Sequence, residues 1–324
     1  MSDALKEIKT LLKSDLQKFE TVFSGSVKTQ VSLLDTILNY IVKRKGKQVR
    51  PMFVLLSAGC FGTINDRSFR GASLVELLHT ATLVHDDVVD ESYKRRGFFS
   101  INALWKNKIA VLVGDFLLSR GLILSVQNKD FDLLEIATEA VQRMSEGELL
   151  QLEKARKLDI TEKDYFDIIG KKTASLFSAC TAIGAASTSQ SKEAIENMKN
   201  FGEFAGIAFQ IKDDLFDFAS QDTGKPKGID IKERKMTLPL IYALKQAPAA
   251  ERKKIIRTFK KRNLEQKEVL LIIRFIEQSG GVRYAQDQMQ LYLDKAAECL
   301  MQVPDNQYKK MIQALLQFVI NRTK

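Results

Sequence analysis

Residues 74–90 read LVELLHTATLVHDDVVD, and this stretch decides the class of fold. Its apolar residues recur at intervals of three and four, which is the period of an amphipathic α-helix and not of a strand. They are Leu74, Leu77, Leu78, Ala81, Val84 and Val88. The same period recurs over residues 109–126, 131–152, 195–218 and 236–244, and no alternating run is long enough for a sheet. The sequence therefore predicts an all-α protein of ten or more helices, several of them inside the bundle.

Composition agrees with long helices in one globular unit. The 324 residues are 45% hydrophobic and 28% charged, and no proline occurs between Pro51 and Pro226. Such a stretch lacks the strongest helix breaker. No linker rich in Pro, Gly or Ser divides the chain, and the most loop-like segment, residues 221–230, is short enough to join two helices. We expect a single domain over residues 1–324. We expect no membrane span, because no segment approaches eighteen uninterrupted apolar residues.

Net charge and cysteine content restrict the partners and the compartment. A formal net charge of +10 indicates an acidic partner, which is a nucleic acid, an anionic membrane surface or a phosphorylated substrate. Charge alone does not choose among the three. Cys60, Cys180 and Cys299 lie far apart and form no CxxC pair, which argues against disulfides and against a zinc site. A reducing, cytoplasmic location is therefore expected.

The acidic motif at the end of residues 74–90 occurs a second time later in the chain. Residues 84–90, VHDDVVD, and 211–217, IKDDLFD, both read apolar-x-D-D-apolar-apolar-D. Helix residues four apart share a face, so Asp86 should pair with Asp90 and Asp213 with Asp217, with Asp87 and Asp214 close by. Like charges at this spacing destabilise a helix unless a cation binds them. Mg²⁺ prefers such oxygen ligands and leaves positions for water and phosphate.

Two such clusters predict several Mg²⁺ ions around one diphosphate. The competing interpretation is a pair of solvated acidic helix ends. Because both clusters stand at apolar helix positions, where solvation does not explain them, we favour the metal.

Basic groups accompany the acidic clusters. The segment GKQVRP at residues 46–51 contains Lys47 and Arg50, and RRG at residues 95–97 follows the first cluster. Arginine matches a phosphate with two parallel hydrogen bonds, and lysine adds a point charge. A further basic run, residues 260–262, is interpreted as a solvated helix face.

The two histidines of the chain, His79 and His85, both lie in the helix of the first cluster. We interpret His79 as a diphosphate donor. The sequence leaves His85 either as a support for the neighbouring carboxylate or as a packing residue.

In this order the motifs resemble the all-trans polyprenyl diphosphate synthases, long-chain relatives of farnesyl diphosphate synthase. The resemblance runs from about Gly46 to Pro239 and comprises GKQVRP (46–51), LLHTATLVHDDVVD (77–90), RRG (95–97), GDFLL (114–118), KTASLF (172–177), AFQIKDDLFD (208–217), GKPKGID (224–230) and KMTLP (235–239). It implies helices around a deep central cavity, usually in a homodimer.

The resemblance also implies a role for each matching residue. The Mg²⁺ ligands, about three ions in all, would be Asp86, Asp90, Asp213 and Asp217, supported by Asp87 and Asp214. The diphosphate of isopentenyl diphosphate would bind Lys47, Arg50, His79 and Arg96. The allylic diphosphate would bind Arg95, Lys172, Thr173, Gln210 and Lys227.

The activity implied by the resemblance is a Mg²⁺-dependent condensation of isopentenyl diphosphate with an allylic diphosphate. The product would be a long-chain polyprenyl diphosphate, near octaprenyl length, with a quinone side chain among its uses and peripheral membrane contact for its release. Alternatives are a shorter-chain synthase of farnesyl or geranylgeranyl type, a class I terpene cyclase, a non-catalytic regulatory subunit and a helical nucleic-acid binder. Paired basic segments argue against a cyclase, and two intact acidic clusters argue against a regulatory subunit and a nucleic-acid binder.

Product length should depend on the helix that carries Asp86. The growing chain would pass Ala81 and Thr82 and then Leu78 and Val75. At 1.5 Å per residue, Val75 lies about 16 Å below Asp86. Short-chain relatives often carry an aromatic residue near the position of Ala81 or Thr82, so small residues here predict an open tunnel. Its floor is expected on a neighbouring helix, the one that holds Phe131, Ile136 and Ala137, with no single residue assigned.

Overall fold

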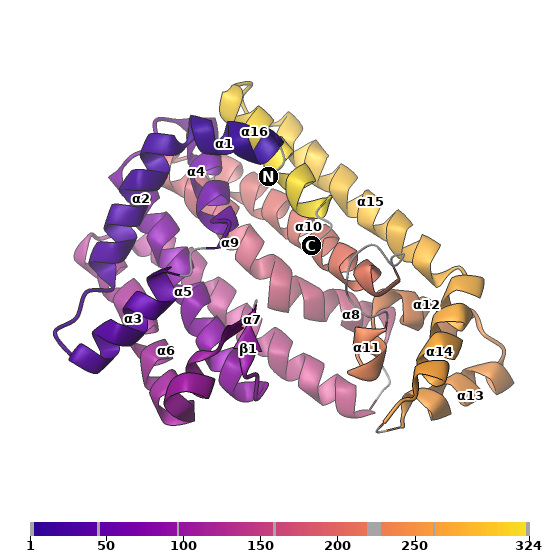
Figure 1. Cartoon of the computed structure of the whole chain (residues 1–324). Helices are drawn as coiled ribbons and strands as arrows, with labels where there is room; N and C mark the ends of the chain where they lie inside the picture. Colours follow the sequence, from indigo (N-terminus) through magenta and orange to yellow (C-terminus); the bar gives the residue numbers. More distant parts are fainter. Residues whose placement is uncertain are drawn as a thin grey trace.

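A computed structural model describes residues 3–43, 46–95, 97–157, 160–218, 228–261 and 263–321, with the side chains of residues 156 and 157 left undescribed. The first half contains α1 (Asp3–Leu11), α2 (Lys13–Ser26), α3 (Ser32–Lys43), α4 (Val49–Phe61), α5 (Asp66–Val89), α6 (Ile101–Gln127) and α7 (Phe131–Lys157). Helices dominate the chain from end to end (Figure 1).

The second half continues with α8 (Glu162–Ile169), the π-helical turn η1 (Gly170–Ala174), α9 (Ser175–Thr188), α10 (Lys192–Leu215), the 3₁₀ turn η2 (Phe216–Phe218), α11 (Ile229–Lys232), α12 (Leu238–Gln246), α13 (Ala249–Phe259), α14 (Gln266–Gln278), α15 (Gly281–Met301) and α16 (Gln307–Ile320). The predicted all-α class with ten or more helices is confirmed.

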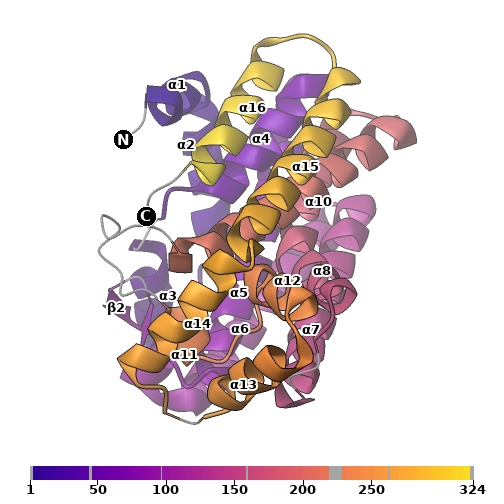
Figure 2. The same ribbon diagram turned by 90° about the vertical axis from the view of Figure 1, so that its right-hand side faces the viewer.

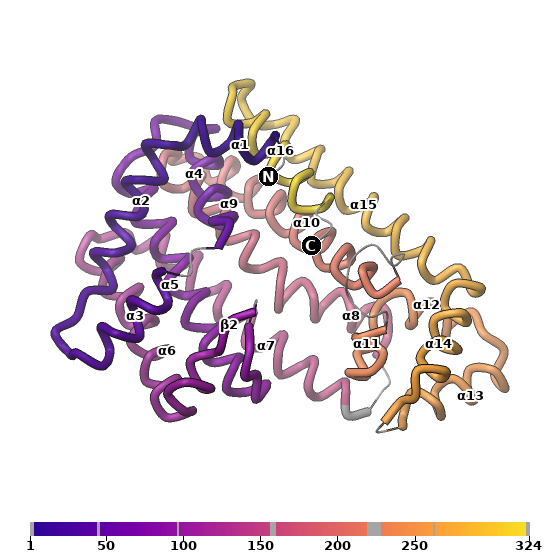
Figure 3. The backbone as a smooth tube through the Cα atoms, viewed as in Figure 1, coloured from indigo at the N-terminus to yellow at the C-terminus, as the bar shows by residue number. Residues whose placement is uncertain are grey.

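The centre of the bundle is formed by α4, α5, α9 and α10. The pairs α5 with α6, α4 with α9, and α10 with both α9 and α15 lie in contact along their lengths, and the tube in Figure 3 traces these paths. All ten residues from Pro51 to Cys60 are buried, so α4 is covered on every side. This confirms that some helices lie inside the bundle, as their apolar faces predict.

Helices α11 to α14 form a smaller cluster at one end of the molecule (Figure 1), and this end faces the viewer in Figure 2. Its buried members come from all four helices, with Ile231 of α11 and Val269 of α14 among them. The cluster is separate from the main core and packs beside the segment that follows α10.

Two local boundaries differ from the sequence prediction. Two short strands, β1 (Lys94–Arg95) and β2 (Phe98–Phe99), form an antiparallel pair between α5 and α6, where no sheet was predicted. Gly97, at a φ of 82°, lies between them in a conformation that favours glycine. The loop predicted at residues 221–230 lies outside the described residues up to 227, and its last two residues begin α11.

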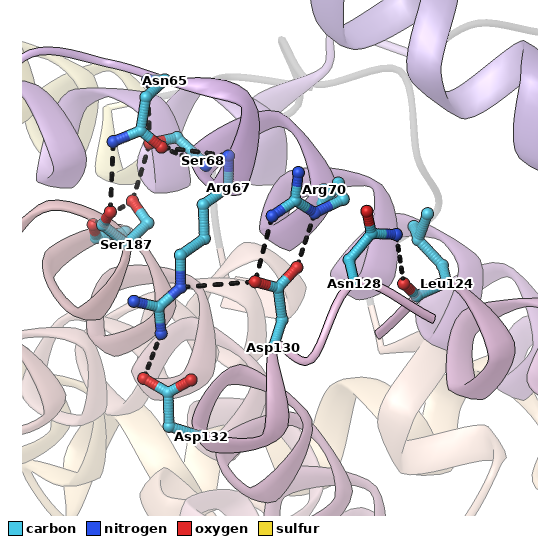
Figure 4. Close-up of polar contacts among 10 residues, drawn as sticks. Asn65, Arg67, Ser68, Arg70, Leu124, Asn128, Asp130, Asp132 and Ser187 are labelled. Atoms are coloured by element: carbon cyan, nitrogen blue, oxygen red, sulfur yellow. Dashed lines mark hydrogen bonds and ion pairs between the residues drawn. The ribbon is translucent and has the colours of Figure 1, made fainter. Parts of the chain in front are cut away.

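A buried ionic cluster fixes the start of α5, far from the acidic motif at its other end (Figure 4). The carboxylate of Asp130, only 5% exposed, accepts from Nε of Arg70 at 2.6 Å and lies 3.5 Å from Nε of Arg67. Arg67 also pairs with Asp132. Two arginines on one buried carboxylate therefore clamp α5 to the connection between α6 and α7.

Helix α6 is long and apolar enough to cross a membrane by length and composition, although only 33% of its most apolar window is buried in the protein. It is kinked at Lys106, which has a φ of 69°. Its outer stripe includes the exposed side chains of Leu112, Ile123 and Val126, with Asp115 between them. The sequence criterion of an uninterrupted apolar run did not detect this face, because charged residues interrupt the run.

Candidate active site

The first acidic cluster lies at the end of α5. Asp90 continues the last helical turn, since its backbone N–H donates to the carbonyl of Asp86 at 2.8 Å, so the predicted i, i+4 relation is confirmed. Asp86 is half-buried and Asp90 is exposed. Asp87 is buried and faces away from solvent, and its Oδ1 accepts from Nε of Arg95 at 2.7 Å. Asp87 thus orients the predicted diphosphate ligand Arg95, whose guanidinium has further donors.

A π-helical turn presents the lysine that faces this cluster. Nζ of Lys172, in η1, lies 2.5 Å from Oε2 of Glu148 on α7 and donates to Oε1 of Gln151 at 3.2 Å. Glu148 and Lys172 both act electrostatically on Asp86. Single π turns occur frequently at functional sites.

Two glycines allow neighbouring helices to approach this turn. A Cβ on Gly147 of α7 would lie 2.6 Å from the backbone nitrogen of Lys172, and one on Gly206 of α10 would lie 2.5 Å from Cα of Ala174. Any larger residue at either position would push a helix away from η1. The turn is therefore held between the helices that contribute to the two halves of the site.

The next residue of the turn connects to the second acidic cluster. Thr173 donates to Oε1 of Gln210 at 2.9 Å, and Nε2 of Gln210 donates to Oδ1 of Asp214 at 2.9 Å. The other oxygen of Asp214 accepts from the hydroxyl of buried Tyr165 at 2.7 Å. The chain of hydrogen bonds occupies both oxygens of Asp214 and fixes the direction in which the amide of Gln210 points.

We expect Tyr165→Phe to weaken catalysis about tenfold, since residues that orient ligands commonly cost 10- to 100-fold when altered. The variant leaves one oxygen of Asp214 without its donor in a buried place, which should also lower the free energy of unfolding by about 1–3 kcal/mol. Initial rates and thermal unfolding check both. Tyr242→Phe is the matched control, because Tyr242 stacks on Tyr284 through its ring. Equal effects of the two variants would contradict this role.

The second cluster differs from its prediction in geometry. Helix α10 ends at Leu215, so Asp217 lies in the 3₁₀ turn η2 and not in the same α-helix as Asp213. Asp213 is exposed, whereas Asp217 is buried. The oxygens of Asp217 accept from the backbone N–H groups of Ile229 at 3.0 Å and Asp230 at 2.8 Å. Asp217 therefore caps α11, and metal binding by Asp217 stays a prediction.

The donor set suits a hard divalent cation. At the first cluster Glu148 and Asp90 act electrostatically on Asp86, and at the second Asp213 acts on Asp230, so each cluster gathers negative charge. Among the residues that the structure describes, no three Asp, Glu, His or Cys side chains form a metal-binding group by themselves. Mg²⁺ commonly binds through one or two carboxylates plus substrate phosphates, so these residues fit it.

Burial and like charge alter the acidity of these carboxyls. Burial, reinforced by Glu148, raises the pKa of Asp86 to about 6, and burial raises the pKa of Asp214 to about 7. Burial and the charge of Asp217 raise the pKa of Asp230 to about 6. Ionising each of these carboxyls therefore costs free energy in the metal-free protein at neutral pH. A bound cation would lower that cost.

Stability of the metal-free protein should reflect these shifts. A carboxyl with a raised pKa binds more protons folded than unfolded between about pH 4 and pH 7, so its contribution to the free energy of unfolding falls as pH rises through that window. Asp86→Asn removes one such group and should flatten the decline. Thermal unfolding in EDTA across pH 4–8 measures the decline for the wild type and the variant. An unchanged slope would contradict the assignment.

The basic segment at residues 46–51 begins α4 and meets α5. Arg50 forms a two-pronged ion pair with Glu76, through Nε at 3.0 Å and Nη2 at 3.1 Å. Glu76 lies one turn from half-buried His79, so the structure brings Arg50 to the same stretch of α5 as His79. Nζ of exposed Lys47 lies 5.4 Å from the ring centroid of Phe318 on α16. The predicted ligands Arg96 and Lys227 lie outside the described residues.

His85 belongs to packing and not to the carboxylate cluster. Its Nε2 lies 3.3 Å from the carbonyl of Val111 and 3.4 Å from Oδ1 of Asp115, both on α6. A Cβ on Gly114 would meet the imidazole ring at 2.1 Å. His85 therefore joins α5 to α6, which decides between the two interpretations left by the sequence.

The predicted tunnel residues lie on the buried side of α5. Val75 and Leu78 belong to the main core, whereas Ala81 packs in the cluster that α5 shares with α6. Thr82 is half-buried, and its hydroxyl donates to the carbonyl of His79 at 2.8 Å. Of the floor candidates, Ala137 is buried, Ile136 is partly buried, and Phe131 is 59% exposed. Phe131, the first residue of α7, thus faces outward, and the position of the tunnel floor stays a prediction.

Sequence reasoning missed several side chains at this site: Glu76, Glu148, Gln151, Tyr165 and Asp230. Only one signal pointed to any of them. Glu148 and Gln151 stand three residues apart, on one face of α7. The partners of the other three come from distant segments, which no local pattern shows.

Comparisons with known proteins agree with this geometry. The polyprenyl synthetase family matches residues 31–276. Octaprenyl diphosphate synthase of Escherichia coli is 33% identical, with 99% of each chain covered. The crystal structure of a decaprenyl diphosphate synthase from Rhodobacter capsulatus superimposes with a TM-score of 0.92 at 32% identity, covering 99% of each chain.

A third protein is similar and was solved with ligands. Polyprenyl synthase from Caulobacter crescentus, complexed with calcium and isoprenyl diphosphate, has a TM-score of 0.88 and 31% identity, over 99% of this chain and 98% of that one. The paired acidic clusters, the basic residues around them and the match over most of the length lead to one conclusion: this chain belongs to the polyprenyl synthetase family of prenyltransferases.

Proposed function

We propose that the protein condenses isopentenyl diphosphate with an allylic diphosphate into a long-chain all-trans polyprenyl diphosphate, near eight isoprene units. The observation that carries the length is the small side chain of Ala81, about one and a half helical turns before Asp86 on the buried side of α5. Beyond it the buried residues of this face remain apolar as far as Leu74. Similarity to octaprenyl and decaprenyl synthases supports a long product.

The far end of this apolar face of α5, toward the start of the helix, is polar. Arg70 stands about 24 Å from Asp86 along α5, at 1.5 Å per residue, and Figure 4 shows its ion pair with buried Asp130. An apolar chain that passed this point would have to separate the buried carboxylate of Asp130 from its arginine partner, which is costly. We infer that growth straight along α5 ends at this cluster, so a chain of eight units must continue along a neighbouring helix, where the floor is expected.

The basic residues around the clusters form two sets, one for each diphosphate. Lys172, Thr173 and Arg95 would bind and orient the allylic diphosphate, and Arg50, Lys47 and His79 would bind isopentenyl diphosphate. About three Mg²⁺ ions, when bound by the carboxylates, would supply charge for the departing diphosphate. The allylic C–O bond breaks and its electron pair leaves with diphosphate, and the double bond of isopentenyl diphosphate forms the new C–C bond.

The final proton would pass to the departing diphosphate, since the described part of the site shows no side chain committed as a base. The buried apolar walls of α5 and α6 would exclude water from the carbocation.

A second copy of the chain is proposed as the partner of α6. The exposed side chains of Leu112, Ile123 and Val126 form an apolar stripe on α6 that a second copy would cover. Covering it in a homodimer also removes the need for a membrane around this helix. A cytoplasmic location agrees with the free thiols of Cys60, Cys180 and Cys299.

Incubation with isopentenyl diphosphate, farnesyl diphosphate and Mg²⁺ tests the function. Chromatography of the dephosphorylated products should show elongated chains near eight units. Cyclised hydrocarbon would indicate a cyclase, a farnesyl or geranylgeranyl product a shorter-chain synthase, and no turnover by the folded protein would contradict the proposal.

A further inference from the structure

The segment from Ala249 to Gln278, which contains α13 and α14, is the most basic surface that the proposed reaction does not use. It carries nine lysine or arginine residues and four glutamates, a net +5 that is half of the charge of the whole chain. Six of its cations are exposed and form no ion pair within the described residues: Arg252, Lys253, Lys254, Arg257, Lys260 and Arg274. Of the glutamates, Glu265 and Glu268 are paired with Lys267 and Lys261.

Apolar side chains stand within this basic surface. Lys267, Leu270, Leu271 and Arg274 follow the i, i+3, i+4, i+7 spacing of one helical face. Leu270 and Leu271 are each 39% exposed, whereas Val269 and Ile272, which flank them in sequence, are buried. The outer face of α14 thus presents two leucines flanked by cations. This combination is typical of helices that lie on an anionic lipid surface.

Helix α14 of this surface contacts α11, which lies at the second acidic cluster. A Cβ on Gly228, which precedes α11, would lie 2.2 Å from Cγ1 of Val269 on α14, so the start of α11 rests directly on α14. The same α11 supplies the backbone N–H groups that bind Asp217, and it contains Asp230. A surface that bound α13 and α14 would therefore lie beside the second acidic cluster.

We propose that α13 and α14 dock the protein on an anionic lipid bilayer and hold the second acidic cluster close to the membrane. The inference rests on the proposed long-chain product, whose apolar tail cannot dissolve in water. Phosphate-rich headgroups complement the unpaired cations, each worth about a fivefold gain in affinity near such a surface. The exposed leucines favour lipid over a nucleic acid, whose backbone offers them no apolar partner.

The test is cosedimentation of the full chain with phosphatidylcholine vesicles that do or do not contain phosphatidylglycerol. Wild-type protein should bind the anionic vesicles, not the neutral ones, and should be released by about 1 M NaCl. The triple variant Lys253→Glu, Arg257→Glu and Lys260→Glu should bind more than about a hundredfold more weakly. Leu270→Ser with Leu271→Ser should weaken binding about tenfold.

The matched control reverses three exposed lysines elsewhere: Lys28→Glu, Lys192→Glu and Lys310→Glu. Equal loss in the control and the triple variant, or equal binding of both vesicle types by wild type, would overturn the proposal. Tighter binding of an RNA oligonucleotide than of vesicles, unaffected by the leucine change, would assign the surface to nucleic acid instead.

Turnover without vesicles separates this inference from the proposed function. Variants that lose vesicle binding should keep wild-type turnover in detergent solution. Absence of long products from the wild type would refute the proposed function, whereas the vesicle measurements would still decide the docking surface.

Discussion

Asp86→Ala and Asp213→Ala should each lower turnover by several orders of magnitude, with the helical fold intact. Asp86 is the half-buried carboxylate that faces Lys172 and Glu148, and Asp213 is the exposed member of the second cluster. Each removes charge that would hold Mg²⁺ on the departing diphosphate, where electrostatic stabilisation is usually the largest contribution to catalysis. Steady-state rates across a Mg²⁺ titration measure the effect.

Stability distinguishes this loss from misfolding. Because burial disfavours the Asp86 carboxylate, Asp86→Ala should raise the melting temperature of the metal-free protein at pH 8 or leave it unchanged. Asp217→Ala should instead lower the melting temperature, because α11 loses its cap. The expected loss of unfolding free energy is about 1–2 kcal/mol.

Glu196→Ala, an exposed change on the same helix as Asp213, is the control for turnover and should be neutral. Near-normal rates for Asp86→Ala and Asp213→Ala at limiting Mg²⁺ would sink the metal assignment.

Ala81→Phe should convert the long product to farnesyl or geranylgeranyl length. Ala81 is buried where α5 packs on α6, and a phenyl ring there would fill the path proposed for the growing chain. The diphosphate-binding residues are untouched, so condensation of the first units should continue. Chromatography of products from equal turnover measures the change in length.

Thr82→Phe provides a second variant, because overpacking a closed core commonly costs 1–3 kcal/mol and half-buried Thr82 has more room. Met301→Phe, at a position 75% exposed on α15, adds the same ring outside the path and should leave product length unchanged. If both Ala81→Phe and Thr82→Phe remain active and make the wild-type product, the chain does not grow along this face of α5.

The comparison of α5 with α10 shows how far spacing alone predicts a site. For Asp86 and Asp90 the i, i+4 rule held, because backbone hydrogen bonds continue through Asp90. For Asp213 and Asp217 the same spacing crosses the end of α10 at Leu215. There the helix tightens into η2, and Asp217 is drawn to the backbone of α11, a segment twelve residues away.

The sequence by itself determined the helical class, the residue types of the two acidic clusters and the basic segments that accompany them. These follow from periodicity and charge, which are properties of neighbouring residues. Only the tertiary structure decided that η1 stands between the clusters, with Lys172 facing Asp86 and Thr173 linked through Gln210 to Asp214. It also placed His85 in packing and Glu148 in the site, because contacts between distant segments depend on how whole helices pack and leave no mark in local spacing.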